Sequence, residues 1–132
     1  KCVVADGGMH HYAAATFRGR RIRDNYPVRI MRRQSAEVLT ELETVSIVGP
    51  LCTPEDCIVK KAELPPIHEG DYIAFPNAGA YGLSYSPLYF LGHATPAELL
   101  DYRGEVHVIR EHGDRTDLLH HQRMIALPEN VR

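Results

Sequence analysis

Short apolar runs separated by turn-forming residues dominate this 132-residue chain. Most runs are too short for a helix, are rich in Val, Ile, Leu and Tyr, and are bounded by Gly, Pro, Asp or Asn, which is typical of strands. The pattern predicts strands at residues 2–5, 28–31, 44–48, 58–59, 72–75, 98–102 and 105–110, the last two forming a hairpin around Arg103-Gly104. The four small or β-branched residues in a row at 2–5 suit a buried strand that is covered on both faces.

Helical signals are weaker and are confined to two short segments. Met9 to Phe17 contains Ala13-Ala14-Ala15, which favours a short helix. Thr116 is a suitable N-cap for a second short helix from Asp117 to about Arg123. Short strands with Gly and Pro turns and little helix predict one mainly β domain over residues 1–132, either a β-barrel or a sandwich.

Composition excludes several kinds of function. A net charge of -2 gives no electrostatic basis for binding nucleic acid or an anionic membrane. No apolar run approaches the roughly 20 residues that a membrane-spanning helix needs. Three cysteines are too few for a disulfide framework, so we expect reduced cysteines and a cytoplasmic location. Cys52 and Cys57 lack a second pair of metal ligands, so we expect no metal site.

Two loops between Val48 and Leu100 suit a functional site. Gly49-Pro50-Leu51-Cys52 closes one predicted strand, and Asn77 through Gly82 closes another. Each loop has turn-forming residues and carries a side chain that can react or form hydrogen bonds, which is typical of site loops on a β scaffold.

These loops also carry a resemblance to a known family. The chain resembles the C-terminal β domain of the fold-type III pyridoxal-phosphate (PLP) decarboxylases, the group of ornithine, diaminopimelate and arginine decarboxylases. Three blocks match in the family's order: Asp6 through Met9, Gly49 through Asp56, and Glu69 through Tyr81. The resemblance covers most of the chain and implies a Greek-key-like β-barrel of the alanine racemase and decarboxylase type.

The resemblance implies a cofactor and a missing domain. PLP accepts the electron pair left on an amino acid when its carboxylate departs, and an enzyme lysine holds the cofactor beforehand. Lys60 and Lys61 lie in a charged stretch that suits a solvated position. The cofactor lysine is therefore expected in an N-terminal (βα)8 barrel that this chain lacks. The chain begins inside a predicted strand without Met or a signal pattern, which also indicates a fragment.

Three residues receive site roles from the resemblance. Cys52 would cross the interface of a homodimer into the partner's active site and act as a proton donor. Tyr81 would donate a hydrogen bond to the PLP phosphate, and Tyr89 would line the substrate pocket. From the residues alone, Cys52 also fits a buried small hydrophobic residue, and Tyr81 an aromatic lid on the barrel. The isolated domain is expected to be inactive.

Two departures from the family pattern concern the substrate. Thr53 stands where related decarboxylases usually have an acidic residue for the distal amine of the substrate; Asp56 could replace it or be a turn residue. Ala14-Ala15 stands where diaminopimelate decarboxylases have Arg-Pro. His10 and His11 are then the polar candidates for the pocket, or solvated loop residues.

The residues of these motifs are most similar to those of one subgroup of the family, which is associated with exosortase-linked polysaccharide clusters. This subgroup resembles enzymes that act on aminoacyl groups held by a carrier protein. The resemblance therefore predicts a PLP-dependent decarboxylase of an amino acid, with a carrier-tethered aminoacyl substrate as the finer prediction. The alternatives are a decarboxylase of free diaminopimelate or ornithine, and a non-catalytic regulatory homologue.

Overall fold

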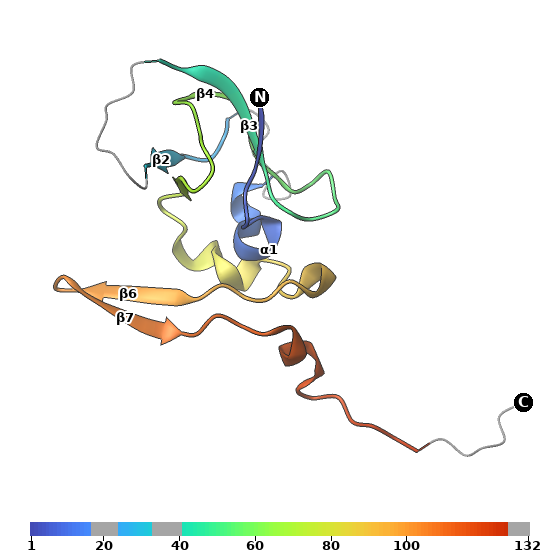
Figure 1. Ribbon diagram of the computed structural model, residues 1–132. Coiled ribbons are helices and arrows are strands. Elements are labelled where there is room, and N and C mark those ends of the chain that lie inside the picture. Colours follow the sequence, from blue (N-terminus) through green and yellow to red (C-terminus); the bar gives the residue numbers. More distant parts are fainter. Residues whose placement is uncertain (17–23, 33–40, 127–132) are drawn as a thin grey trace, which may run out of the picture.

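The computed structural model describes residues 1–16, 24–32 and 41–126 of the chain. It is mainly β, as the sequence predicts (Figure 1). The strands are β1 (Cys2–Val4), β2 (Arg29–Met31), β3 (Glu43–Val48), β4 (Cys57–Leu64), β5 (Tyr72–Ala74), β6 (Glu98–Tyr102) and β7 (Glu105–Arg110). The helical segments are α1 (Met9–Tyr12) and the 3₁₀ turns η1 (Ala13–Ala15), η3 (Gly79–Tyr81), η4 (Leu83–Tyr85), η5 (Phe90–Gly92) and η6 (Arg115–Leu119).

The strands form three small sheets. The first has the order β1-β3-β4, with β1 parallel and β4 antiparallel to β3. The other two are the antiparallel pairs β2-β5 and β6-β7. The predicted Greek-key-like barrel is not confirmed, because the strands among the described residues do not close into one sheet.

Strand β3 supplies the centre of the core. Val45 and Ile47 alternate with more exposed neighbours along the strand, and both are fully buried. They pack with Val59, Leu64 and Ile67 in one cluster. Partly buried side chains from β1, β2 and β5 lie against this cluster, which joins the first two sheets around one core.

Strand β4 is longer than the predicted segment because it contains a bulge. Val45 pairs with Ala62 and Ile47 with Val59, so Ser46 faces both Lys60 and Lys61. The extra residue bends the strand, and Lys61 has a φ of 48°. The bulge is stabilised by the side chain of Asn25, whose Oδ1 accepts from Lys60 N at 2.7 Å and whose Nδ2 donates to Lys60 O at 2.9 Å.

The prediction that the first strand is covered on both faces is wrong. Strand β1 lies at the edge of its sheet and pairs with β3 alone among the described strands. One of its faces is also open to solvent, because Cys2 and Val4 are exposed, Val4 to 70%. A run of small and β-branched residues indicates a strand without showing whether both of its faces are covered.

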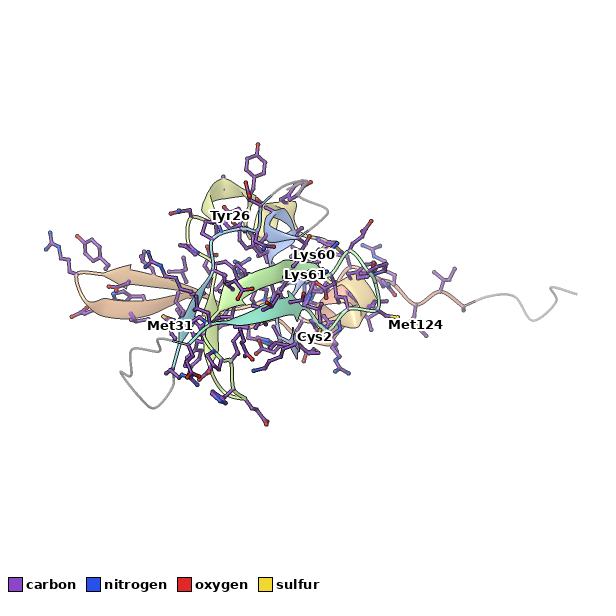
Figure 2. The ribbon with its side chains drawn as sticks, turned by 90° about the horizontal axis from the view of Figure 1, so that it is seen from above. Cys2, Tyr26, Met31, Lys60, Lys61 and Met124 are labelled. Carbon is purple, nitrogen blue, oxygen red and sulfur yellow. The ribbon has the colours of Figure 1, made fainter. Side chains whose placement is uncertain are left out.

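The predicted hairpin of β6 and β7 is confirmed with its expected bounds. Arg103 and Gly104 both have positive φ, as a tight two-residue turn requires. The hairpin projects away from the rest of the molecule (Figure 1 and Figure 2). Its residues are exposed from Glu98 to Ile109, including Leu99, Val106 and Val108.

The predicted last helix is a shorter 3₁₀ turn that begins earlier. Asp114, not Thr116, caps it: the Asp114 carboxylate accepts from Thr116 N at 2.8 Å, and the Asp117 carboxylate accepts from Asp114 N at 2.9 Å. This reciprocal capping box fixes η6 at Arg115–Leu119. Among the described residues, no helix has the length and apolar character needed to cross a membrane.

Candidate functional site

The site is built around α1, where the three motif blocks of the sequence meet. The chain leaves β1 through Gly7 and Gly8 and enters α1 at Met9, whose side chain is buried. Met9, Ala13 and Leu51 form a second, smaller core cluster. Leu51 belongs to the second block, so this cluster packs that block against α1.

A single buried carboxylate holds the first two blocks together. Asp56 is 2% exposed. Its Oδ1 accepts from Met9 N at 2.6 Å, and its Oδ2 accepts from Leu51 N at 2.8 Å. Its own carbonyl accepts from Gly49 N at 2.9 Å, which closes the turn 49–56. The carboxylate is therefore occupied by backbone donors, and this geometry does not offer it to the amine of a substrate.

The carboxylate explains the glycines of both blocks. A Cβ on Gly8 would lie 2.5 Å from Asp56 Oδ1, and a Cβ on Gly49 would lie 2.3 Å from Asp56 Oδ2. Gly8 has an extended backbone, and neither residue has positive φ. The constraint on both positions is thus space rather than backbone conformation, since other residues adopt such angles freely.

Cys52 and Thr53 lie at the tip of the closed turn. Cys52 is exposed and has a free thiol, so the alternative of a buried hydrophobic residue does not describe it. Thr53 is half-buried, and its backbone donates to Leu51 O at 2.8 Å. The anchoring of Leu51 on one side and Asp56 on the other leaves the thiol at a fixed position facing outward.

The segment that follows the third block is tied to Ala13, directly after α1, through Ser86. Its hydroxyl accepts from Ala13 N at 3.0 Å and donates to Gly82 O at 2.9 Å. Tyr81, at the end of η3, is 69% exposed and meets Tyr85 edge-to-face at 6.0 Å. The Tyr81 side chain is open to the outside, while the adjacent Gly82 is linked through Ser86 to Ala13, directly after the helix that Asp56 holds.

Tyr89 lies further along the same connection. It has a left-handed backbone conformation with φ 61° and a half-buried side chain. Left-handed geometry is uncommon for a tyrosine, which indicates that its surroundings fix this part of the loop.

The two predicted histidines belong to a larger histidine cluster. His10 is 2% exposed, and its ring lies 3.9 Å from that of His11 and 4.8 Å from that of His93. All three line a cavity of about 410 Å³ together with Asp6, Ala94, His112, Gly113, Asp114 and Arg115. His10 Nδ1 is buried without a hydrogen-bond partner among the described residues.

Burial lowers the pKa values of His10 and His11. The pKa of His10 is lowered to about 4, chiefly by burial and in addition by the neighbouring His11 and His93. Burial also lowers the pKa of His11, partly opposed by its hydrogen bond to the backbone of Ala94 and by Asp6. At neutral pH the wall of the cavity formed by these two rings is polar and uncharged.

Several of these contacts could not be predicted from the sequence. The positions of Ser86, His93 and His112 in the chain give no sign that they join α1, because the contacts depend on how the loops fold back. The buried role of Asp56 has a weak signal: glycines in both blocks are compatible with a group that approaches the backbone closely.

The described lysines are not arranged to hold PLP. Lys1 Nζ donates to Glu43 at 2.6 Å and to Ile67 O at 3.0 Å. Lys60 and Lys61 lie in the bulge of β4 (Figure 2). The exposed Tyr81 phenol fits the role of a hydrogen-bond donor to a phosphate, since it makes no hydrogen bond within the described part of the chain and a phenol can donate to an anion. In the same residues, no group of three or more His, Cys, Asp or Glu is arranged for a metal ion.

Comparison with known proteins identifies the family. A sequence model described as "Pyridoxal-dependent decarboxylase, C-terminal sheet domain" matches residues 1–79. The chain belongs to this family. The domain therefore comes from a PLP-dependent decarboxylase family, and its exposed site residues lie within or next to the matched segment.

Three relatives illustrate the similarity. L-glutamyl-[BtrI acyl-carrier protein] decarboxylase of Niallia circulans is 50% identical over 117 residues, which cover 89% of this chain and 27% of that protein. Diaminopimelate decarboxylase of Methanothermobacter thermautotrophicus is 39% identical over 84 residues, 64% of this chain and 19% of the relative. The crystal structure of diaminopimelate decarboxylase from M. jannaschii with L-lysine matches 94% of this chain and 26% of its own, with a TM-score of 0.73 and 27% identity.

The chain spans only 19% to 27% of the length of these three relatives. It corresponds to the C-terminal sheet domain of such enzymes, and the remainder of each relative has no counterpart in this chain. The structural match confirms the domain type and the arrangement of its elements.

We predict that Gly49→Ala destabilises the protein only while Asp56 is present. The new methyl group would displace the carboxylate and its two hydrogen bonds, so we expect a loss of about 2 kcal/mol or more in the free energy of unfolding. In an Asp56→Ala background the same methyl group has room, and we expect Gly49→Ala to cost less than about 0.5 kcal/mol. Urea unfolding of the four proteins measures the coupling; equal costs in both backgrounds would contradict it.

We also predict that His10 makes the protein less stable in mild acid. Because its pKa in the folded state is about 4, below the value of about 6.5 in the unfolded chain, only the unfolded state takes up this proton as the pH falls from 6.5 to 4. At pH 5 the loss attributable to His10 is roughly 2 kcal/mol.

Urea unfolding at pH 7 and pH 5 tests this prediction. His10→Gln should remove most of the loss, although His11 still contributes in the same direction. His121→Gln, which changes an exposed histidine, is the matched control and should behave like the unmodified protein. An unchanged pH dependence in His10→Gln would show that the buried ring is not responsible.

Proposed function

We propose that this chain is the C-terminal domain of a PLP-dependent decarboxylase acting on an amino acid or a carrier-tethered aminoacyl group. The observation that carries the proposal is the pair of exposed side chains, Cys52 and Tyr81, on two loops fastened to one helix of a domain from this family. The complete protein would hold the cofactor through a lysine in an N-terminal (βα)8 barrel. This domain would be inactive alone.

PLP, when bound, supplies an electron sink for the electron pair left by the departing carboxylate. Tyr81 would donate a hydrogen bond from its phenol to the phosphate, which fixes the cofactor's orientation. Cys52 would hold a proton on Sγ and deliver it to the substrate carbon that has lost carbon dioxide. Tyr89 would line the substrate pocket and help to exclude water.

A homodimer in which Cys52 reaches the partner's site is part of this proposal. The exposed position of Cys52 at the tip of a rigid turn suits a residue that acts outside its own domain. The exposed apolar residues of the β6-β7 hairpin, such as Leu99 and Val108, indicate a surface that another part of the protein covers. The free thiols of all three cysteines fit a reducing compartment such as the cytoplasm.

We propose that the complete protein closes these strands into the Greek-key-like barrel. Edge strand β1 and residues 67–73, which lead into edge strand β5, line a cavity of about 690 Å³. Unpaired strand edges on two sides of one groove are suited to an added strand, which would satisfy their backbone groups and join the first two sheets.

The substrate is proposed to be an aminoacyl group on a carrier protein. Thr53 is neutral and Ala14 carries no charge, so neither can clamp a free distal amine or carboxylate. A relative at 50% identity is named for a carrier-protein substrate, which supports this choice. Free diaminopimelate or ornithine is the second candidate, favoured by the diaminopimelate decarboxylases among the relatives.

Carbon dioxide release by the complete protein with PLP tests the proposal. Free ornithine, lysine, arginine and diaminopimelate would be offered beside a panel of aminoacyl thioesters on a carrier protein, glutamyl included. We expect release from tethered substrates and at least 100-fold less from every free amino acid, because neither Thr53 nor Ala14 carries a charge that could receive the free end. Faster release from a free diamino acid would contradict the substrate, and no release from any substrate in a correctly folded, PLP-loaded protein would favour the regulatory homologue.

A further inference from the structure

We propose that Asp56 is a positioning residue for Cys52. The inference rests on the proposed function, in which Cys52 delivers a proton to the substrate. In this inference, the buried carboxylate of Asp56 determines where the Cys52 thiol lies and in which direction it points. The carboxylate itself touches neither substrate nor cofactor.

The hydrogen bonds of Asp56 lead directly to the residue before the thiol. Leu51 N donates to Oδ2 at 2.8 Å, and Leu51 immediately precedes Cys52. Met9 N donates to Oδ1 at 2.6 Å and opens α1. One rigid, planar group, 47 residues after Met9 in sequence, therefore bridges α1 and the turn and sets the position of Cys52 relative to the helix.

The closed turn transmits this constraint. Asp56 O accepts from Gly49 N at 2.9 Å, and Asp56 N donates to Thr53 O at 3.1 Å. Cys52 is thus enclosed between two residues, Leu51 and Thr53, that are each bonded to Asp56. The Cys52 side chain is exposed and has no other anchor of its own among the contacts of the described residues, so a change at Asp56 should move it.

The two backbone N–H donors, from Met9 and Leu51, require a carboxylate as their acceptor. Both oxygens accept from backbone N–H groups, and such bonds to an ionised acceptor are stronger than neutral ones. An asparagine of the same shape would place an NH₂ group against one of the two N–H donors. The backbones of Gly8 and Gly49 lie so close to the carboxylate that a Cβ on either would be under 3 Å from it, which leaves no space for another arrangement.

A kinetic double-mutant cycle in the complete, PLP-loaded protein tests whether Asp56 acts through Cys52. We expect Asp56→Asn to lower kcat by about 10-fold to 100-fold, with KM changed less than about threefold, since a displaced catalytic group impairs the chemical step. In a Cys52→Ala background, Asp56→Asn should have no further effect on kcat. A merely structural residue would lower kcat by the same factor in both backgrounds, and that result would overturn the proposal.

Alkylation of the Cys52 thiol gives a readout that does not depend on activity. Iodoacetamide labelling, mapped by peptide mass spectrometry well below the unfolding temperature, should change at least threefold at Cys52 in Asp56→Asn. Glu55→Gln, an exposed neighbour in the same turn, is the control and should label like the unmodified protein. Unchanged labelling of Cys52 in Asp56→Asn would overturn the proposal.

The two readouts separate the failure of this inference from that of the proposed function. If Cys52→Ala leaves kcat unchanged, the role of Cys52 in catalysis is wrong, while altered labelling in Asp56→Asn still supports the positioning role. If Asp56→Asn does not fold, Asp56→Glu keeps the charge but lengthens the side chain, and it should change labelling and kcat in the same directions. Wild-type labelling and kcat in a folded Asp56→Glu protein would contradict the inference.

Discussion

The burial of one carboxylate, Asp56, is the constraint on which this domain's site depends. A buried charge is costly unless hydrogen bonds replace its hydration. Here two backbone N–H groups, from Met9 and Leu51, meet this requirement. Those donors belong to separate motif blocks, so satisfying the carboxylate brings the blocks together. The glycines at positions 8 and 49 are then required, because any larger side chain would collide with its oxygens.

The surrounding site combines rigid anchors with exposed functional groups. The Asp56 bonds, the Met9-Ala13-Leu51 cluster and the Ser86 hydroxyl hold three loops on α1. The side chains that the proposal uses, Cys52 and Tyr81, are the exposed ends of these anchored loops. Such a division suits a domain that completes an active site formed mainly by other parts of a larger enzyme.

Local patterns were sufficient to predict several elements of the fold. The β6-β7 hairpin follows from its alternating residues and from Arg103-Gly104, and strand β3 follows from its apolar alternation. Strand β4 was underestimated because its bulge at Lys60 and Lys61 interrupts the apolar pattern. The final turn begins at Arg115 because Asp114 and Asp117 cap each other, which outweighs the cap predicted at Thr116.

The site was predictable only as a set of loops. The motif blocks indicate which segments matter, but spacing cannot show that Asp56 faces inward while Cys52, four residues earlier, faces outward. Burial of the Asp56 carboxylate depends on the approach of Gly8, which is distant in sequence. The grouping of His93 and His112 with His10 depends on the path of the C-terminal segment, and no local signal records it.

Amide hydrogen exchange at Met9 and Leu51, followed by NMR, tests the central role of Asp56 most directly. If both amides donate to the buried carboxylate, they should exchange as slowly as the core amides of Val45 and Ile47, because their release requires unfolding of the site. Exchange at the rate of an exposed turn amide such as that of Glu55 would show that the carboxylate does not hold the two segments together.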